Sequence, residues 1–165
     1  MSSRRIIGFP RVFSSGMLGN NQPYIVLELL GLSIKEILKK NKRHFTVPCV
    51  VTIGLRMLDL LEKFHEEGFI HCDLKPDNIM IGNYIEDPKA MNQLYLIDFG
   101  ISQRYLDEKG EHIPMNTKVP FKGNVIFSSK HAFQNLTLSR RDDIISMVYF
   151  LIFCINSNQS WIDTQ

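Results

Sequence analysis

The sequence has few of the features that mark secreted, zinc-binding or nucleic-acid-binding proteins. Its three cysteines, Cys49, Cys72 and Cys154, are odd in number and lack metal-ligand spacing, so they indicate neither a disulfide framework nor a zinc site. The basic N-terminus has no apolar core of signal-peptide length. A net charge of +2 indicates no polyanionic partner. We therefore expect reduced thiols, a cytoplasmic or nuclear location, and no binding to nucleic acid.

No apolar run reaches the roughly 20 residues that a membrane-spanning helix needs. The most apolar stretch, residues 144–155, is shorter and is interpreted as a buried core helix rather than a membrane anchor. We therefore expect no membrane partner. The 165 residues, of which 44% are hydrophobic and 22% charged, suffice for one globular domain with its own core.

Hydrophobic periodicity predicts one long helix over residues 46–67, which Thr46 can cap and Gly68 can end. Apolar residues at spacings of three and four mark the face that packs into the core: Val50, Ile53, Met57, Leu58, Leu61 and Phe64. A shorter helix is predicted over residues 33–40, with Ser33 as its cap.

Short extended segments surround these helices. Residues 24–30 are rich in β-branched and apolar side chains and predict a buried strand. Three shorter strands are predicted at residues 69–71, 78–81 and 93–97. Residues 102–141 are polar with little periodicity, which is typical of a functional or mobile loop. The apolar helix that follows is expected to begin at Asp143.

Two aspartates each follow a predicted strand, where an α/β scaffold presents side chains to a cleft. Asp73 lies in the segment HCDLKPDN and Asp98 in the segment IDFG. Lys75 should point to the same side of its loop as Asp73, and Asn78 adds a neutral oxygen ligand. A magnesium–nucleotide site requires such hard oxygen ligands together with positive charge for the phosphoryl group. The two segments together therefore predict a site for Mg²⁺ and a nucleotide.

These segments resemble two motifs of protein kinases. Residues 71–78 are similar to the H-R-D-L-x-x-x-N catalytic loop, and residues 98–100 are similar to the D-F-G motif. The chain more particularly resembles the casein kinase I family of serine/threonine kinases. That resemblance covers nearly the whole chain and rests on four segments: GFP at 8–10, LELLG at 27–31, HIP at 112–114 and SRRDD at 139–143.

The resemblance implies a chemical role for each residue that matches the two motifs. Asp73 would orient and deprotonate the hydroxyl of a substrate, and Lys75 would steady the γ-phosphate of ATP. Asn78 and Asp98 would hold Mg²⁺. The implied reaction transfers the γ-phosphate of ATP to Ser and Thr hydroxyls of protein substrates.

Further residues are implied to bind the nucleotide or to support the loops. The positions implied for ATP binding are Glu28, Leu30, Met80, Ile97 and Asp98. Of these, Glu28 and Leu30 would use backbone groups, while Met80 and Ile97 would lie beneath the adenine ring. Structural support is implied for His71, Phe99 and Asp143. Asp143 would bond to the backbone of residues 71–78.

The fold class implied is α+β, namely a kinase-like fold that consists mainly of the helical C-terminal lobe. Residues 1–31 would be the hinge strand and what is left of the small lobe, and residues 32–165 would be an incomplete large lobe. No G-x-G-x-x-G loop or V-A-I-K-like strand precedes the hinge strand. We therefore expect the chain to be incomplete and weak or inactive alone.

Three single residues also depart from the pattern. Cys72 replaces the arginine of H-R-D and is expected to be a half-buried, inert thiol. Ile126 replaces an arginine that is thought to bind acidic or phosphorylated substrates, and Val148 replaces a glycine in the central helix. Four basic residues are candidates to compensate for the lost arginine: Lys118, Lys122, Lys130 and Arg140.

A second class of function is a non-catalytic, kinase-like binding module that holds a partner protein over its exposed apolar face. The presence of Asp73, Lys75, Asn78 and Asp98 together favours the kinase. Stabilisation by Mg·ATP is the observation that separates the two.

Overall fold

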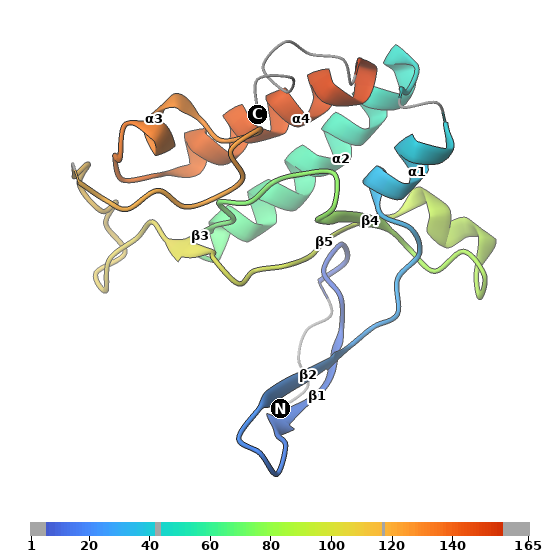
Figure 1. Ribbon diagram of the computed structural model, residues 1–165, viewed down its shortest axis with the longest axis horizontal. Coiled ribbons are helices and arrows are strands. Elements are labelled where there is room, and N and C mark those ends of the chain that lie inside the picture. The colour runs from blue at the N-terminus through green and yellow to red at the C-terminus, as the bar shows by residue number, and fades with distance from the viewer. Residues whose placement is uncertain (1–5, 42–43, 117, 157–165) are drawn as a thin grey trace.

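The computed structural model describes residues 6–41, 44–116 and 118–156, and it has an α+β architecture (Figure 1). The helices are α1 (Ile34–Lys40), α2 (Val47–Glu66), α3 (Lys130–Phe133) and α4 (Arg140–Ile155), with the 3-10 helix η1 at Pro88–Asn92. The strands are β1 (Val12–Met17), β2 (Pro23–Leu27), β3 (Phe69–Ile70), β4 (Ile79–Ile81), β5 (Leu94–Leu96) and β6 (Gln103–Arg104). In this described part they form antiparallel pairs: β1 with β2, β3 with β6, and β4 with β5.

The core lies where α2 packs along α4 (Figure 1). Met57 on α2 and Phe150 on α4 are fully buried there. The two helices approach closely at Gly54, where a Cβ would lie 3.0 Å from the Leu151 side chain. The apolar stripe of α2 differs from the prediction at Leu58, which is 43% exposed because it lines a cavity between the two helices.

Local sequence determines how the first two helices begin and end. The Ser33 hydroxyl accepts a bond from the Glu36 amide at 3.2 Å, and the Ser33 amide donates to the Glu36 carboxylate at 2.8 Å. This reciprocal pair lowers the pKa of Glu36. Thr46 precedes α2 as predicted but makes no side-chain bond that caps the helix. Gly68, with a φ of +83°, supplies the left-handed turn after α2.

The prediction of a buried strand over residues 24–30 is wrong. β2 ends at Leu27, and all of its residues are exposed. The reason is that, within the described residues, β2 pairs only with β1. The resulting hairpin projects away from the helices (Figure 1), so that no described layer covers its apolar side chains. An isolated hairpin of this kind is marginally stable on its own.

The helix expected from Asp143 begins three residues earlier, at Arg140. The Ser139 amide donates to the Asp142 carboxylate at 2.7 Å and so closes the first turn. Residues 144–155 form the rest of α4, which packs in the core as predicted. Among the described residues, no helix is both long and apolar enough to cross a membrane.

Candidate functional site

The first part of the site is the Asp73 loop, residues 71–78, which connects β3 to β4. The Lys75 ammonium group lies 2.5 Å from Asp73 Oδ2. The Asn78 amide nitrogen donates to the Asp73 backbone carbonyl at 2.9 Å and to Asp73 Oδ2 at 3.1 Å. The structure thus brings three sequence-predicted residues into contact. The Asp73 and Lys75 side chains are 10% and 24% exposed, so both are held by the protein yet reachable from solvent.

The Asp73 loop is anchored by Asp143, on the first turn of α4. Asp143 Oδ2 accepts the His71 amide at 2.8 Å, and Oδ1 accepts the Cys72 amide at 3.0 Å. Cys72 has a φ of +68°, a backbone conformation that costs a non-glycine residue on the order of 1–3 kcal/mol. The bonds from the buried carboxylate hold that strained residue in place and fix the direction in which Asp73 leaves the strand.

His71 connects the Asp73 loop to the strand that precedes Asp98. Its Nδ1 accepts the Asp73 amide at 3.2 Å, so the ring proton is on Nε2, which donates to the Ile97 carbonyl at 3.0 Å. Burial lowers the pKa of His71 below its usual 6.5, although the hydrogen bond to Ile97 and the charge of Asp143 oppose this shift. His71 is therefore a neutral structural link at pH 7.

The second part of the site is the Asp98 loop, residues 98–100, which follows β5. Asp98 has a φ of +63° and is exposed. Among the described residues, its Oδ1 accepts one long bond of 3.4 Å, from the Gly100 amide within the loop. Phe99 turns back toward the protein, with its ring centroid 5.2 Å from that of Phe64 and 5.5 Å from that of His71. Phe99 therefore anchors the loop while Asp98 faces solvent.

The two loops meet through the β4–β5 pair. The Ile97 amide donates to the Asn78 carbonyl at 3.0 Å, which places Asn78 beside the residue that precedes Asp98. Since the Asn78 amide nitrogen is bonded to Asp73, its side-chain oxygen is left for a metal. Among the described residues, no cluster of three or more His, Cys, Asp or Glu side chains forms a complete metal site. An amide oxygen plus one carboxylate fits Mg²⁺, which usually takes its other ligands from phosphates and water.

The segment implied to bind adenine crosses β4 in the structure. The Gly31 amide donates to the Ile81 carbonyl at 2.9 Å, and a Cβ at Gly31 would lie 2.5 Å from the Gly82 carbonyl oxygen. Glu28 and Leu30 come just before this crossing, and each is half-buried. Met80 and Ile97, also half-buried, lie on β4 and directly after β5. These four residues therefore flank the same strand pair.

Cys72 is half-buried, as the sequence predicts. Burial raises its pKa to about 12, with the charge of Asp143 acting in the same direction. The thiol accepts a weak bond from the Gln103 amide at 3.6 Å. It is consequently an inert packing group at neutral pH.

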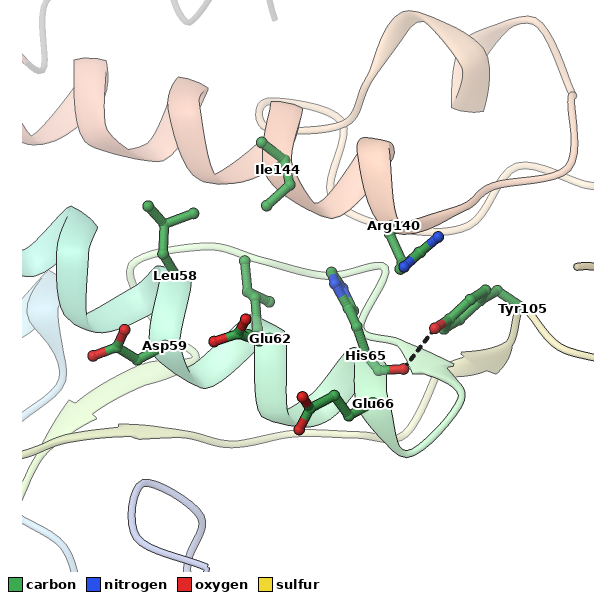
Figure 2. A pocket seen from close by; sticks show the side chains of 9 residues that line it. Leu58, Asp59, Glu62, His65, Glu66, Tyr105, Arg140 and Ile144 are labelled. Atoms are coloured by element: carbon green, nitrogen blue, oxygen red, sulfur yellow. Dashed lines mark hydrogen bonds between the residues drawn. The ribbon is translucent and has the colours of Figure 1, made fainter. Parts of the chain in front are cut away.

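The basic residues proposed to compensate for the lost arginine do not lie at one site. Lys122 lines a small cavity together with Cys72 and Ser128. Arg140 stacks on Tyr105, with its guanidinium carbon 5.0 Å from the ring centroid, in a cavity between α2 and α4 (Figure 2). Glu62 and Glu66 line the same cavity, and the Tyr105 hydroxyl donates to the His65 carbonyl there. Lys130, by contrast, lines a separate cavity with Ile126. Arg140 therefore does not take the place of the lost arginine.

Two supporting residues were missed by the sequence analysis. His65 Nε2 lies 2.8 Å from Asp143 Oδ2, which makes His65 the third donor to that carboxylate. Asp142 accepts from the Ser129 hydroxyl at 2.6 Å and lies 2.8 Å from the His131 ring. The SRRD sequence carried a signal for Asp142, because Ser followed three residues later by an acidic residue is typical of a helix start. His65 gave no such signal, since its partner is 78 residues away.

Comparison with known proteins identifies the family. A model of the protein kinase domain matches residues 1–157, so the chain belongs to the protein kinase family. Within it, the chain is 34% identical over 140 residues to a probable casein kinase I homolog of Encephalitozoon cuniculi. It is 32% identical over 158 residues to casein kinase 1-like protein HD16 of Oryza sativa subsp. japonica, and 33% identical over 143 residues to a probable serine/threonine-protein kinase of Dictyostelium discoideum. The chain is thus casein kinase I-like.

The matched regions cover most of this chain but only part of each relative. They make up 85%, 93% and 86% of this chain, against 42%, 22% and 28% of the three proteins in the same order. The chain therefore spans less than half the length of these relatives.

Proposed function

We propose that this chain is the part of a casein kinase I-like serine/threonine kinase that carries the catalytic loop, and that it acts on protein substrates. The observation that supports this most strongly is the contact of Asp73 with Lys75 and Asn78, joined to the Asp98 loop by the Ile97–Asn78 bond. The proposed cofactors are ATP and Mg²⁺, which protein kinases use in general.

Asp73 is proposed to accept the proton of a substrate hydroxyl. In the described part of the chain Lys75 and Asn78 both reach Oδ2, which leaves Oδ1 to face the hydroxyl. The Lys75 ammonium group is near enough to Asp73 to hold the γ-phosphate beside the same hydroxyl. Asn78 and Asp98 would hold Mg²⁺, which would neutralise the charge of the phosphates. The two loops are held in fixed positions relative to each other by contacts of His71, Phe99 and Asp143.

We further propose that residues 1–31 belong to the small lobe and hinge and that residues 32–165 belong to the large lobe; residues 1–5 and 157–165 of these parts lie outside the described residues. The exposed β1–β2 hairpin, the crossing at Gly31 and the helical packing of α2 with α4 support this division. Glu28 and Leu30 are proposed to bind the adenine edge through their backbone, with Met80 and Ile97 beneath the ring.

The test is phosphoryl transfer from labelled ATP to Ser- and Thr-containing peptides by the purified protein and its Asp73→Asn variant. The variant keeps the shape of the side chain but is a poor proton acceptor, so the transfer rate should fall by about 100-fold or more. Asp77→Asn is the matched control, because Asp77 lies in the same loop but pairs with Lys35 at 2.6 Å on the exposed side. Equal rates for wild type and Asp73→Asn would refute the assignment.

The alternative is a non-catalytic kinase-like module that binds a partner protein through its apolar surface. Val47, Val51 and Leu55 form an exposed stripe on α2, each more than half exposed (58%, 55% and 60%), which favours such a partner. Thermal unfolding with and without Mg·ATP discriminates the two functions. A ligand at 100 times its Kd adds about 2.7 kcal/mol of stability, whereas a module that does not bind the nucleotide shows no change in Tm.

A further inference from the structure

A cavity of about 620 Å³ lies away from the two loops, where α1 and α2 face η1 and the β4–β5 pair (Figure 1). None of the described residues that line it belongs to the Asp73 loop or the Asp98 loop. Binding sites for small molecules usually have volumes of about 300–1,000 Å³ and mostly apolar walls with a few polar groups. The cavity therefore has the size of such a site and is separate from the proposed site of phosphoryl transfer.

The inner wall of the cavity is apolar and belongs to the core. Ile34 on α1, Ile53 on α2 and Leu94 on β5 line the cavity and are 2%, 7% and 4% exposed. Met91 on η1 also lines it and is 52% exposed, although it is apolar. Since packed core side chains form the inner wall, the cavity has its shape before a ligand arrives. Contact with this wall removes apolar surface from water, which favours a ligand with a hydrocarbon body.

Two basic residues, Lys40 and Arg56, line the same cavity, and none of its described lining residues is acidic. Lys40 is the last residue of α1 and is exposed. Arg56 lies on α2, where one of its guanidinium nitrogens donates to the Asn92 carbonyl and so holds the side chain at the cavity. A guanidinium group has five N–H donors, so further donors of Arg56 can bind an anion. The cavity thus combines an apolar wall with positive charge.

Glu36 interacts electrostatically with Lys40 but does not line the cavity. Its carboxylate accepts from the Ser33 amide at 2.8 Å and from the Ser33 hydroxyl at 2.9 Å. These bonds hold the Glu36 carboxylate at the start of α1, whereas Lys40 lies at the end of the helix. The positive charge of Lys40 is therefore available to a ligand in the cavity.

We propose that this cavity binds a small organic acid with an apolar body, of the kind that a medium-chain fatty acid represents. The hydrocarbon part lies against the core side chains, and the carboxylate binds Lys40 and Arg56. The occupant is argued from charge complementarity and from the volume of the cavity. Hydrogen bonds between ionised groups are the stronger ones and fix the orientation of a ligand. The binding does not depend on the proposed function, because none of these residues has a role in phosphoryl transfer.

The test measures the binding of decanoate, 1-decanol and decylammonium to the purified protein by isothermal titration calorimetry at pH 7.5. The three probes have the same chain length, so they differ in the charge of the head group. Decanoate should bind about tenfold more tightly than 1-decanol, and decylammonium should bind more weakly than 1-decanol. No binding of decanoate, or binding of either other probe as tight as that of decanoate, would overturn the proposal.

Cys49 reports whether the ligand occupies this cavity, because its thiol is exposed and it lines the cavity. Saturating decanoate should remove most of the reactivity of Cys49 toward iodoacetamide. Decanoate that binds without slowing this alkylation would lie elsewhere, which would overturn the proposal. Protection by an acidic, leucine-containing peptide but not by decanoate would overturn it in favour of a protein partner. Protection that grows with protein concentration alone would overturn it in favour of a second copy of this chain.

Two neighbouring lysines provide a variant and its matched control. Lys39 and Lys40 are both exposed and both interact electrostatically with Glu36, but Lys39 is not among the described residues that line the cavity. Lys40→Gln should weaken decanoate binding by about threefold and leave 1-decanol binding unchanged. Lys39→Gln should change neither. Unchanged decanoate binding by the Lys40→Gln variant, or an equal loss in the two variants, would contradict the assignment of the carboxylate site.

Discussion

The Asp73 loop and the Asp98 loop carry the same kind of side chain in opposite environments. In the Asp73 loop, the His71 and Cys72 amides bond to the buried Asp143 carboxylate, which is 2% exposed. In the Asp98 loop, the aspartate is exposed and accepts a bond of 3.4 Å from its own loop. Both loops contain one non-glycine residue with positive φ, Cys72 and Asp98.

Under the proposed function, this contrast separates two tasks within one site. A group that removes a proton works best when the fold fixes its direction before the substrate arrives. A group that holds a metal together with a nucleotide can be ordered by that ligand instead, because Mg²⁺ brings its own geometry. The hydrogen bonds preorganise the Asp73 loop, and under the proposed function the final geometry of the Asp98 loop depends on the ligand.

The largest expected difference comes from Asp→Asn substitutions at Asp143, which anchors the Asp73 loop, and at Asp98, which lies in the Asp98 loop. Asp143→Asn replaces one acceptor oxygen by an amide group that faces buried N–H donors, so the free energy of unfolding should fall by about 2–4 kcal/mol. Asp98→Asn changes an exposed side chain and should alter it by about 0.5 kcal/mol or less. Urea unfolding at pH 7 measures the free energy of unfolding of both variants. An equal loss of this free energy in the two variants would show that the two loops do not differ in how the fold holds them.

The next effect is a dependence of stability on pH that arises in the Asp73 loop. The pKa of His71 is lowered in the folded protein, so the unfolded chain binds a proton first as the pH falls through 6.5. The contribution of neutral His71 to the free energy of unfolding is fully present above that pH and is lost as the pH falls further. For one proton, the free energy of unfolding falls by at most about 1.4 kcal/mol per pH unit.

Unfolding measured between pH 7.5 and pH 5.5 shows this slope, and nitrogen NMR of the His71 ring should show the neutral form with its proton on Nε2 at pH 6.5. His112→Gln is the control, because His112 is exposed and its ring bonds only to a neighbouring carbonyl among the described residues. A protonated His71 ring at pH 6.5 would contradict the buried link between the loops.

The smallest effect concerns thiol reactivity and leaves stability unchanged. Burial raises the pKa of Cys72 and of Cys154 to about 12, so at pH 8 only on the order of one thiol in ten thousand is ionised. Cys49 is exposed and should be alkylated by iodoacetamide while the other two are not. Mass spectrometry of peptides from the folded protein reports each site. Rapid labelling of Cys72 would show that the Asp73 loop opens readily.

The sequence predicted local features well where neighbouring residues determine them. Ser33 and Glu36 begin α1, Gly68 ends the turn after α2, and the strands on either side of the Asp73 loop form where the apolar runs lie. The family could also be recognised from short segments, because the HCDLKPDN and DFG sequences leave few other interpretations.

Features that depend on distant residues could not be predicted. β2 has the composition of a buried strand, but its exposure depends on which layers cover it. Leu58 fits the helical stripe, yet the gap between α2 and α4 leaves it open. The bond from His65 to Asp143 joins two helices that are far apart in the sequence, so neither local segment predicts this contact.

Amide hydrogen exchange with and without Mg·ATP tests most directly whether the two loops form a magnesium–nucleotide site. Without ligand, the His71 and Cys72 amides should exchange slowly and the Gly100 amide quickly, because only the former bond to a buried carboxylate. With Mg·ATP, residues 98–100 should become protected while residues 71–78 change little, and Asp98→Asn should abolish that protection. Exchange in both loops that Mg·ATP does not alter would contradict the account.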